Sequence, residues 1–568
     1  MKQTRKILAM LLCIAMVLGM ATTVFATETY TITVPDDDRT YEIYQIFTGD
    51  LSEGVLSNVV WGRNGTGYVA DKTTAVPSDV LEALEAVATS TDNKAKLDVI
   101  NQYVKLDTDA FETLNTAEDE VSAQVAPGYY LIKDADDAIE DGDYDAFTTY
   151  IVQIVGDVTI TRKASVPSVD KVILDYEDEV KVNEAAIGED VEYKITGTLP
   201  ATLADYKEYF YRFNDTLSKG LTYNDDLVVY VVNGEAEPIN VTNYFYVDAS
   251  EYNATTGTTI TVAIGDILAL NNVGITVNKD TKIVLEYSAV VNENALINDA
   301  NPNEVDLDFS NNPNQSGEGT PGNPPEYPDE PGDEEPEAPQ PSGPIGKTPE
   351  SEVETYVTKV HIEKVDGAGN ALEGASFEIY GTALKTVIVS TEEFTKDMEN
   401  GTYWKLKDGT YTKTAPVEED DPTTEDVNEK TTDFYESITD KYSCTVNKTK
   451  VVTGENFKAS GAVGEDGKLT FTGLPAGTYT IEEIVTPAGY NTIGEITLVV
   501  TFDADEKTFS YVWSGAVSGT TDTIEVVNQA GSTLPETGGI GTTLFYVFGG
   551  IMVLGAAVLL VTKKRMTA

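Results

Sequence analysis

The chain has 568 residues, too many for one hydrophobic core, so several domains are expected. It carries 38 Lys and Arg residues against 95 Asp and Glu residues, and its pI is near 4.1. This acidity argues against a protein that binds nucleic acid or an anionic membrane, because phosphate groups need positive charge.

Histidine and cysteine are almost absent. His361 is the one histidine, and Cys13 lies in a segment predicted to be removed, which leaves Cys444 as the one mature thiol. This inventory is too small for a Cys/His zinc site or a disulfide. Most of the chain also lacks the histidine that a Ser-His-Asp site needs. The acidic stretch 134–145 lacks the spacing of a calcium loop. We therefore expect no enzyme, no metal and no cofactor.

The N-terminal segment predicts export. Residues 1–26 begin with cations, continue with an apolar run from Ile7 to Met20 and end on the small residue Ala26. This is the order of a secretory signal, and the run is short for a membrane anchor.

The C-terminal segment predicts attachment to a cell wall. An apolar segment, 544–562, and a basic tail, 563–568, follow the motif Leu534, Pro535, Glu536, Thr537 and Gly538. This order resembles the cell-wall sorting signal of Gram-positive surface proteins, which the cysteine transpeptidase sortase reads. The resemblance implies cleavage after Thr537, whose carbonyl passes to an amine, and a membrane stage only before sorting.

Between these signals the pattern predicts β-sandwich domains. Alternating runs rich in Thr, Val, Ile and Tyr recur between Gly, Asn and Asp residues. They include 30–34, 41–47, 150–155, 258–264 and 498–502. A helical period at 79–104 predicts an insertion in the first domain. Residues 314–350, dense in Pro, Gly and acids, predict a linker. We expect domains at 27–165, 166–313 and 351–531.

The third domain places three reactive side chains among apolar inward positions. The period of two does this for Lys364 in YVTKVHIEKVD, for Glu483 in YTIEEIVTPAGY and for Asn528 in TIEVVN. Burial lowers the pKa of a lysine and raises that of a glutamate, so a neutral amine and a protonated acid become available. We expect an isopeptide bond between Lys364 and Asn528 with loss of ammonia, and Glu483 as the catalytic acid.

The stretches KVDGAGNALEGASFEIY, YTIEEIVTPAGY and VVN resemble the B-type immunoglobulin-like (CnaB) domain of Gram-positive pilins and adhesins. The resemblance implies the same three roles for Lys364, Glu483 and Asn528. Ile484 and Thr486 replace the commoner Thr and Ala of the box without touching the acid. The fold implied is mainly β, with tandem immunoglobulin-like (Cna-type) sandwiches.

The middle domain repeats this pattern with Lys171, Asp215 and Asn311. DTLSKGL and DFSNNP resemble the second domain of isopeptide-forming fimbrial subunits, in which an Asp takes the acid role. Asn303 shares the parity of Asn311 and is an alternative amide. The first domain has no lysine between residues 27 and 71, so we expect no bond between its first and last strands.

Polymerisation needs an exposed amine. Alternation in GDVTITRKASVP turns Lys163 to the polar side, and VTITRK is similar to the pilin motif of sortase-built shafts, although the usual Tyr-Pro before the Lys is absent. Lys171 and Lys133 are fallback acceptors, and an ordinary surface lysine is the alternative for Lys163.

These features predict a secreted, wall-anchored shaft subunit of a pilus, in which sortase joins Thr537 to Lys163 of the next copy. Its expected partners are sortase, identical subunits and peptidoglycan, with minor pilins and host surface ligands as further candidates. The alternative is a wall-anchored adhesin or minor pilin that does not polymerise.

Overall fold

The computed structural model describes residues 28–52, 54–88, 99–162, 164–175, 178–206, 208–313, 338–341, 343–416 and 434–531. The predicted signal segment, Lys163, the linker residues 314–337, the sorting motif, the apolar segment and the basic tail lie outside the described residues. Within the described part, no helix has the length and apolar character needed to cross a membrane.

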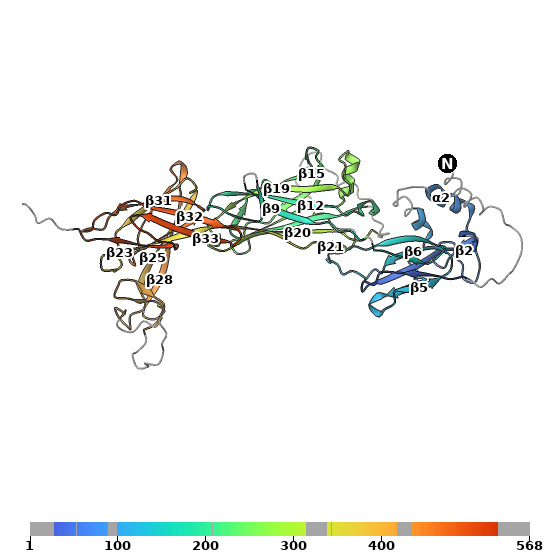
Figure 1. Ribbon diagram of the computed structural model, residues 1–568, viewed down its shortest axis with the longest axis horizontal. Helices are drawn as coiled ribbons and strands as arrows, with labels where there is room; N and C mark the ends of the chain where they lie inside the picture. Colours follow the sequence, from blue (N-terminus) through green and yellow to red (C-terminus); the bar gives the residue numbers. More distant parts are fainter. Residues whose placement is uncertain are drawn as a thin grey trace, which may run out of the picture. The chain divides into compact units, whose positions relative to one another are not determined.

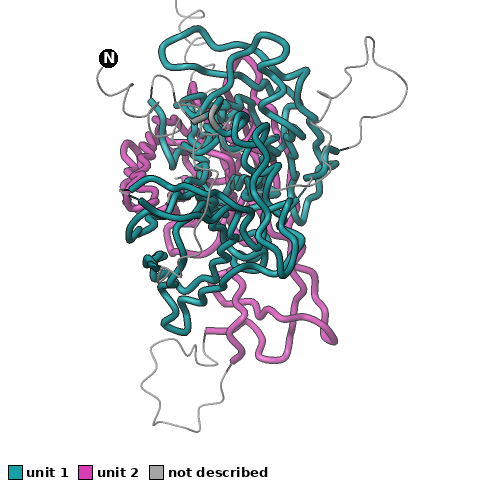
Figure 2. The backbone as a smooth tube through the Cα atoms, turned by 90° about the vertical axis from the view of Figure 1, so that its right-hand side faces the viewer, with its two compact units in different colours: residues 1–183, 190–290, 301–354 teal, residues 184–189, 291–300, 355–568 magenta. Residues whose placement is uncertain are grey.

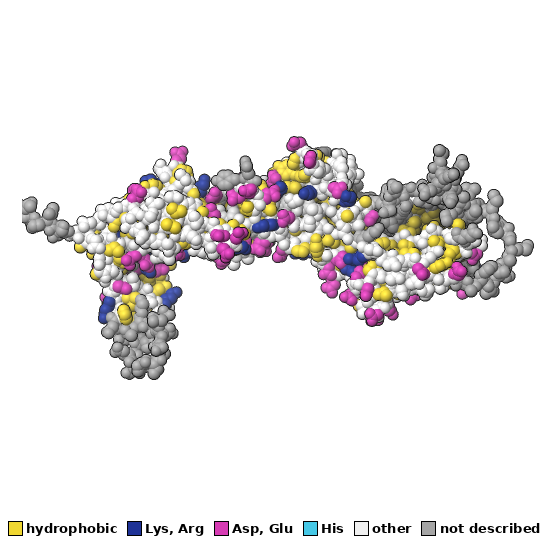
Figure 3. Space-filling model, in the orientation of Figure 1, with side chains coloured by type: hydrophobic (Ala, Val, Ile, Leu, Met, Phe, Trp, Pro, Cys, Tyr) yellow, Lys and Arg dark blue, Asp and Glu magenta, His cyan; other side chains and the backbone are white. Residues whose placement is uncertain are grey.

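The chain divides into two compact units, coloured separately in Figure 2. Unit 1 comprises residues 1–183, 190–290 and 301–354, and unit 2 comprises residues 184–189, 291–300 and 355–568. Almost every element is a strand paired in a sheet, which confirms the mainly β fold. Acidic side chains are spread over the surface in Figure 3, as the composition leads one to expect.

Two sheets enclose the core of the first domain (Figure 1). The smaller has the order β5-β1-β8 and the larger β3-β2-β6-β7, with β4 beside β2. The smaller sheet consists of β1 (Tyr30–Thr33), β5 (Ser122–Val125) and β8 (Val158–Thr159). The larger consists of β2 (Thr40–Ser52), β3 (Val55–Trp61), β4 (Glu112–Asn115), β6 (Gly128–Asp134) and β7 (Thr149–Ile154).

The helical insertion covers the second face of the larger sheet. Val80 of helix α2 (Ser78–Ala88) packs in one buried cluster with Tyr44 and Ile46 of β2. The predicted helix is confirmed at 78–88 and again at residues 99 and 100, whereas residues 89–98 lie outside the described residues. Residues 101–103 form the short 3-10 helix η2 (Asn101–Tyr103), and Val104 is extended because it bridges to Gly65. A second short helix, η3, spans Thr116–Glu118.

The middle domain has two seven-stranded sheets. The first has the order β10-β9-β12-β19-β15-β16, with β14 beside β19. It consists of β9 (Val169–Asp175), β10 (Asp178–Val180), β12 (Asp190–Thr198), β14 (Leu221–Tyr223), β15 (Val228–Asn233), β16 (Ile239–Asn240) and β19 (Thr281–Val291). The short helices are η4 (Leu203–Asp205), η5 (Thr242–Tyr244) and η6 (Ile267–Val273).

The second sheet of the middle domain has the order β11-β22-β20-β13-β18-β17, with β21 beside β20. It consists of β11 (Val182–Glu184), β13 (Tyr211–Leu217), β17 (Tyr246–Ala249), β18 (Thr258–Ile264), β20 (Asn301–Ser310), β21 (Ile345–Lys347) and β22 (Ser351–Tyr356).

The structure differs from the predicted boundary after residue 313. Strands β21 and β22 follow the Pro-rich stretch and return to this sheet, so unit 1 extends to Glu354. The end of the predicted linker is therefore part of the middle domain, and the third domain begins after it. The acids and prolines of this stretch made these strands look like a continuation of the linker.

The third domain is a sandwich of two five-stranded sheets, β28-β25-β30-β23-β34 and β29-β24-β31-β32-β33. The first consists of β23 (Thr358–Asp366), β25 (Thr386–Lys396), β28 (Tyr442–Val452), β30 (Lys468–Leu474) and β34 (Thr523–Asn528). The second consists of β24 (Ser376–Tyr380), β29 (Lys458–Ala462), β31 (Gly477–Val485), β32 (Ile496–Asp503) and β33 (Thr508–Gly515). A hairpin of β26 (Trp404–Lys405) and β27 (Tyr411–Thr412) and the helix η8 (Gly454–Asn456) complete it.

In this domain the first and last strands are neighbours. Strand β23 pairs with β34 in parallel, with Lys364 opposite Val526 and Asp366 opposite Asn528. The core between the two sheets is apolar and includes Val360, Ile362 and Val526. Lys364 follows Val360 and Ile362 on the same inward face of β23, as the period of two predicts.

Candidate crosslinking sites

The middle domain holds a lysine, an acid and an amide together in its interior. Lys171 of β9 is fully buried, and its Nζ lies 2.5 Å from Oδ1 of Asp215 on β13. The same Nζ donates a hydrogen bond to Oδ1 of Asn303 on β20. Lys171 comes from one sheet, whereas Asp215 and Asn303 come from the other. The three side chains therefore meet across the sandwich.

The structure places Asn303, and not Asn311, at this lysine. Asn311 is also buried, but it follows the end of β20, and its backbone oxygen accepts from the Phe147 amide. Its side-chain atoms make no hydrogen bond to the described residues. The choice of Asn311 over Asn303 is thus corrected. Asn303 and Asn311 are an even number of residues apart, so the period of two could not separate them. Only Asn303 lies opposite Leu217, two residues beyond Asp215 on β13.

Burial makes this lysine a potential nucleophile. Removal from water lowers the pKa of Lys171 from 10.5 to about 8, although the Asp215 carboxylate opposes the shift. The Nζ lies 5.4 Å from the ring centroid of Tyr287 and 5.5 Å from that of Tyr193. The uncharged amine is therefore more accessible than in an exposed lysine, and it lies beside the Asn303 amide.

Tyr287 is a member of this cluster that the sequence analysis missed. Its hydroxyl lies 2.9 Å from Lys171 Nζ, 2.7 Å from Asp215 Oδ2 and 2.7 Å from Asn303 Nδ2. The signal available was the alternation in TKIVLEYSAVV, which turns Tyr287 inward beside Leu285. An inward tyrosine is an ordinary core residue, so alternation alone assigns it no chemistry.

The third domain gathers its three predicted residues in a different arrangement. Asn528 is fully buried, and its Nδ2 donates to Glu483 Oε1 over 2.8 Å. The Oδ1 atom of Asn528 is buried and has no hydrogen-bond partner among the described residues. Glu483 Oε2 accepts from the Ile493 amide at 3.1 Å and from Thr486 Oγ1 at 3.2 Å. The acid is thus fixed against the amide.

Lys364 approaches this pair from the adjacent strand. It is fully buried, and its Nζ donates to the backbone oxygens of Val526 (2.9 Å) and Val365 (3.1 Å). Burial lowers the pKa of Lys364 from 10.5 to about 8, against the opposing charges of Glu483 and Asp366. The register places Asn528 two residues beyond Val526, on the same inward face of β34.

The first domain contains a buried lysine with other partners. Lys133 of β6 lies 2.9 Å from Glu42 Oε2 and 2.7 Å from Asp136 Oδ1. These acids hold it as a cation, and the pKa of Lys133 is raised even though burial alone would lower it. Lys133 and Lys171 are both buried, which makes each unsuitable as an exposed acceptor for a partner enzyme.

The predicted acceptor, Lys163, is outside the described residues, but its neighbour is described. Arg162 donates to Asp145 Oδ1 at 2.6 Å and to the Ala146 oxygen at 2.7 Å. The acidic stretch 134–145 is also held through its backbone. The Gly142 amide donates to the Ile345 oxygen at 2.9 Å.

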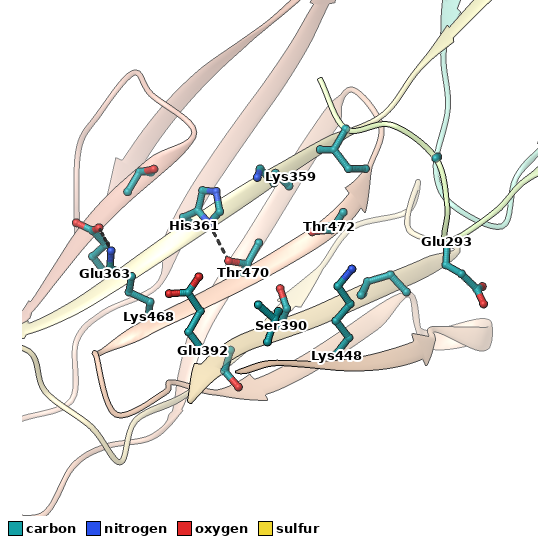
Figure 4. Close-up of a pocket in the computed structure, with 16 residues that line it drawn as sticks. Glu293, Lys359, His361, Glu363, Ser390, Glu392, Lys448, Lys468, Thr470 and Thr472 are labelled. Atoms are coloured by element: carbon teal, nitrogen blue, oxygen red, sulfur yellow. Dashed lines mark hydrogen bonds and ion pairs between the residues drawn. The ribbon is translucent and has the colours of Figure 1, made fainter. Parts of the chain in front are cut away.

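A groove of about 530 Å³ lies on the outer face of the first sheet of the third domain (Figure 4). Strands β23, β25, β28 and β30 supply most of its lining. Its charged side chains are Lys359, Lys448, Lys468, Glu293, Glu363 and Glu392. The lining thus contains equal numbers of lysines and glutamates.

Three protein-family models match parts of this chain. Residues 187–313 match the Gram-positive pilin backbone subunit 2, Cna-B-like domain. Residues 420–516 match a prealbumin-like fold domain, and residues 526–566 match the LPXTG cell wall anchor motif.

Among individual proteins, the trypsin-resistant surface T6 protein of Streptococcus pyogenes serotype M6 is 25% identical over 423 residues, which are 72% of this chain and 70% of that protein. The solved T6 backbone pilin of serotype M6 S. pyogenes is 15% identical with a TM-score of 0.43, over 89% of this chain and 98% of that one. The major pilin SpaA of Corynebacterium diphtheriae is 14% identical with a TM-score of 0.38, over 88% and 99%.

A cell-wall anchor behind a series of β-sandwich domains defines a surface protein of the Gram-positive cell wall. Within that class, the chain has the matched regions of a Gram-positive backbone pilin, namely a Cna-B-like domain, a prealbumin-like domain and an LPXTG anchor. It is a structural subunit of the pilus shaft and not an enzyme. The LPXTG motif implies that sortase acts on it, and the backbone role implies polymerisation with identical subunits.

Proposed function

We propose that this pilin reinforces itself with two internal isopeptide bonds, Lys171 to Asn303 and Lys364 to Asn528. In each, the neutral lysine Nζ attacks the amide carbon, the new C–N bond forms, and the Asn Nδ2 leaves as ammonia with the proton that the amine loses. Asp215 and Glu483 are the acids that polarise the two amides and carry protons.

The observation that carries this proposal is the middle-domain cluster. A buried lysine that needed only a counter-ion would be satisfied by Asp215. Here the same Nζ also contacts the amide of Asn303, the group that it would attack. The lowered pKa of Lys171 supplies the neutral amine.

The test is the intact mass of the mature ectodomain, followed by peptide mapping. We expect a deficit of two ammonia molecules, and one joined peptide pair for each bond. Asp215→Ala and Glu483→Ala should each restore one ammonia, whereas the exposed-acid control Glu192→Ala should restore none. Recovery of Lys171 and Asn303 on separate fragments of the wild-type chain would refute the middle-domain bond.

We further propose that sortase joins the Thr537 carbonyl to the Lys163 amine of the next subunit. The carbonyl is held by the sortase cysteine after Gly538 leaves, and the amine displaces that thiol. A linkage of this kind joins different surfaces of successive copies and does not close, so it produces a fibre. The burial of Lys133 and Lys171 supports Lys163 over those two lysines.

Incubation with the cognate sortase tests this second bond. The wild-type protein should form a ladder of covalent oligomers, and Lys163→Ala should not. Lys72→Ala, which removes an exposed lysine of the same domain, is the matched control and should retain the ladder. A ladder that survives Lys163→Ala would remove the acceptor assignment.

A further inference from the structure

We propose that the hydroxyl of Tyr287 is a catalytic group of the middle-domain crosslink, which relays a proton from the Lys171 amine to the departing nitrogen of Asn303. The inference rests on the proposed bond between these two residues and adds a fourth member to the site.

The geometry that suggests a relay is the position of one oxygen between the two nitrogens that exchange a proton. The Tyr287 hydroxyl accepts from Lys171 Nζ at 2.9 Å and from Asn303 Nδ2 at 2.7 Å. It donates to Asp215 Oδ2 at 2.7 Å. The hydroxyl therefore contacts the nucleophile, the leaving group and the acid at once.

The proton balance of the reaction needs such a bridge. When Nζ bonds to the amide carbon it must lose one proton, and Nδ2 must gain one before it can leave as ammonia. The phenol oxygen takes the proton of Nζ as its own proton passes to Asp215 Oδ2. Once attack has made the amide nitrogen pyramidal and basic, the phenol gives a proton to Nδ2 and recovers one from Asp215, so both Tyr287 and Asp215 end unchanged. Asp215 thus holds the proton between the two transfers, and its other oxygen, which contacts Nζ, stabilises the charge that develops on the attacking amine.

Tyr287 is held in place and kept protonated. Burial, reinforced by the Asp215 carboxylate, raises the pKa of Tyr287 well above its usual value, so the phenol adds no charge of its own. Its ring stacks on Tyr193 at a centroid distance of 5.3 Å and contacts Tyr223 edge-on at 5.7 Å. Strand β19 lies between β12 and β15, which fixes the backbone on both sides.

The third domain offers an internal control, because its site has no equivalent residue. Among the described side chains, no tyrosine hydroxyl bonds to Lys364, Glu483 or Asn528. The two bonds of one chain should therefore respond differently to the loss of the Tyr287 hydroxyl.

The experiment follows both bonds in the full mature chain after pulsed synthesis, by mass spectrometry of the joined peptides. Tyr287→Phe keeps the ring and removes the hydroxyl. We expect it to slow the Lys171–Asn303 bond by on the order of 100-fold, the lower end for proton transfer by a positioned side chain. The Lys364–Asn528 bond should form at the wild-type rate, which also reports that the chain folds. The matched control, Tyr193→Phe, should leave both rates unchanged.

A wild-type rate for Lys171–Asn303 in Tyr287→Phe would overturn the relay and leave the proposed function intact. Equal slowing by Tyr193→Phe would also overturn it, because loss of a hydroxyl outside the relay would then have the same effect. Absence of the bond in the wild-type chain would refute the proposed function itself.

A second measurement needs no variant. Rates of the middle-domain bond in mixtures of H₂O and D₂O should give a curved proton inventory, since two protons move, and a linear inventory would contradict the relay.

Discussion

The two candidate sites use the same three kinds of group but hold the amine differently. In the middle domain the Lys171 ammonium contacts its acid and its amide directly, whereas in the third domain the Lys364 ammonium rests on backbone oxygens. Both lysines nevertheless have their pKa lowered to about 8, with burial as the largest cause in each. The comparison teaches that exclusion of water, more than the identity of the neighbours, prepares the amine.

The sites also differ in what they connect. Lys171 and Asn303 lie on opposite sheets, so a bond between them ties the two halves of the sandwich together. Lys364 and Asn528 lie on neighbouring strands of one sheet, and only the acid, Glu483, comes from the other. In the proposed mechanism, the acid of the third domain would therefore act across the sandwich on a pair that is already adjacent.

The largest expected effect comes from removal of the middle-domain acid. Asp215→Ala should abolish the Lys171–Asn303 bond and leave a buried ammonium without its carboxylate. Loss of a crosslink over 132 residues removes about 5 kcal/mol in the chain-entropy model, and the unpaired charge costs roughly 3–5 kcal/mol more. Denaturant unfolding of the middle domain should show this loss, while Glu192→Ala should unfold as the wild type does. Equal unfolding of both variants would contradict the comparison.

A free lysine should make stability depend on pH. In Asn528→Ala the Lys364 amine cannot be joined, and its pKa is about 8 in the folded chain against 10.5 in the unfolded chain. The unfolded state binds more protons between these values, so the free energy of unfolding should rise as the pH increases from about 8 to 10.5. The joined wild-type amide has no such group to titrate. Equilibrium unfolding at several pH values tests this, and parallel curves for both proteins would contradict it.

A smaller effect is expected at the hydrogen bond that orients the third-domain acid. Thr486→Val removes the hydroxyl that donates to Glu483 Oε2 but leaves the hydrogen bond from the Ile493 amide in place. A hydrogen bond of this kind contributes about 1 kcal/mol, so the Lys364–Asn528 bond should still form, several-fold more slowly. Pulsed synthesis with peptide mapping measures the rate, and the unchanged Lys171–Asn303 bond is the control.

The smallest expected effect is at Asn311, the asparagine that the sequence analysis chose. Asn311→Ala should leave the mass deficit unchanged, because the Asn311 side chain has no contact with Lys171. Asn303→Ala is the matched variant and should restore one ammonia. If Asn311→Ala restores it instead, the middle-domain assignment is wrong.

Much of the fold could be predicted because alternation is a local property of each strand. The period of two turned Lys364, Glu483 and Asn528 inward correctly, and the structure brings Glu483 and Asn528 into contact. The same rule could not choose between Asn303 and Asn311, since that choice depends on the register between β20 and β13, which is set by pairing between distant segments.

The missed elements share this non-local origin. Tyr287 gains its role only from strands β9, β13 and β20, which approach it in space. Strands β21 and β22 are defined by their pairing partners in the middle domain, which their own residues do not reveal. The predicted helix was too long because the backbone of Val104 is taken by a bridge to Gly65.

The parallel pairing of β23 and β34 has a mechanical consequence. The chain enters this pair at Thr358 and leaves it at Asn528, which are at opposite ends of the two strands. Tension along the chain therefore loads the pair in shear, so the hydrogen bonds between the strands bear the load together and do not open one at a time. This geometry alone favours mechanical resistance in the third domain, which precedes the sorting motif in the sequence.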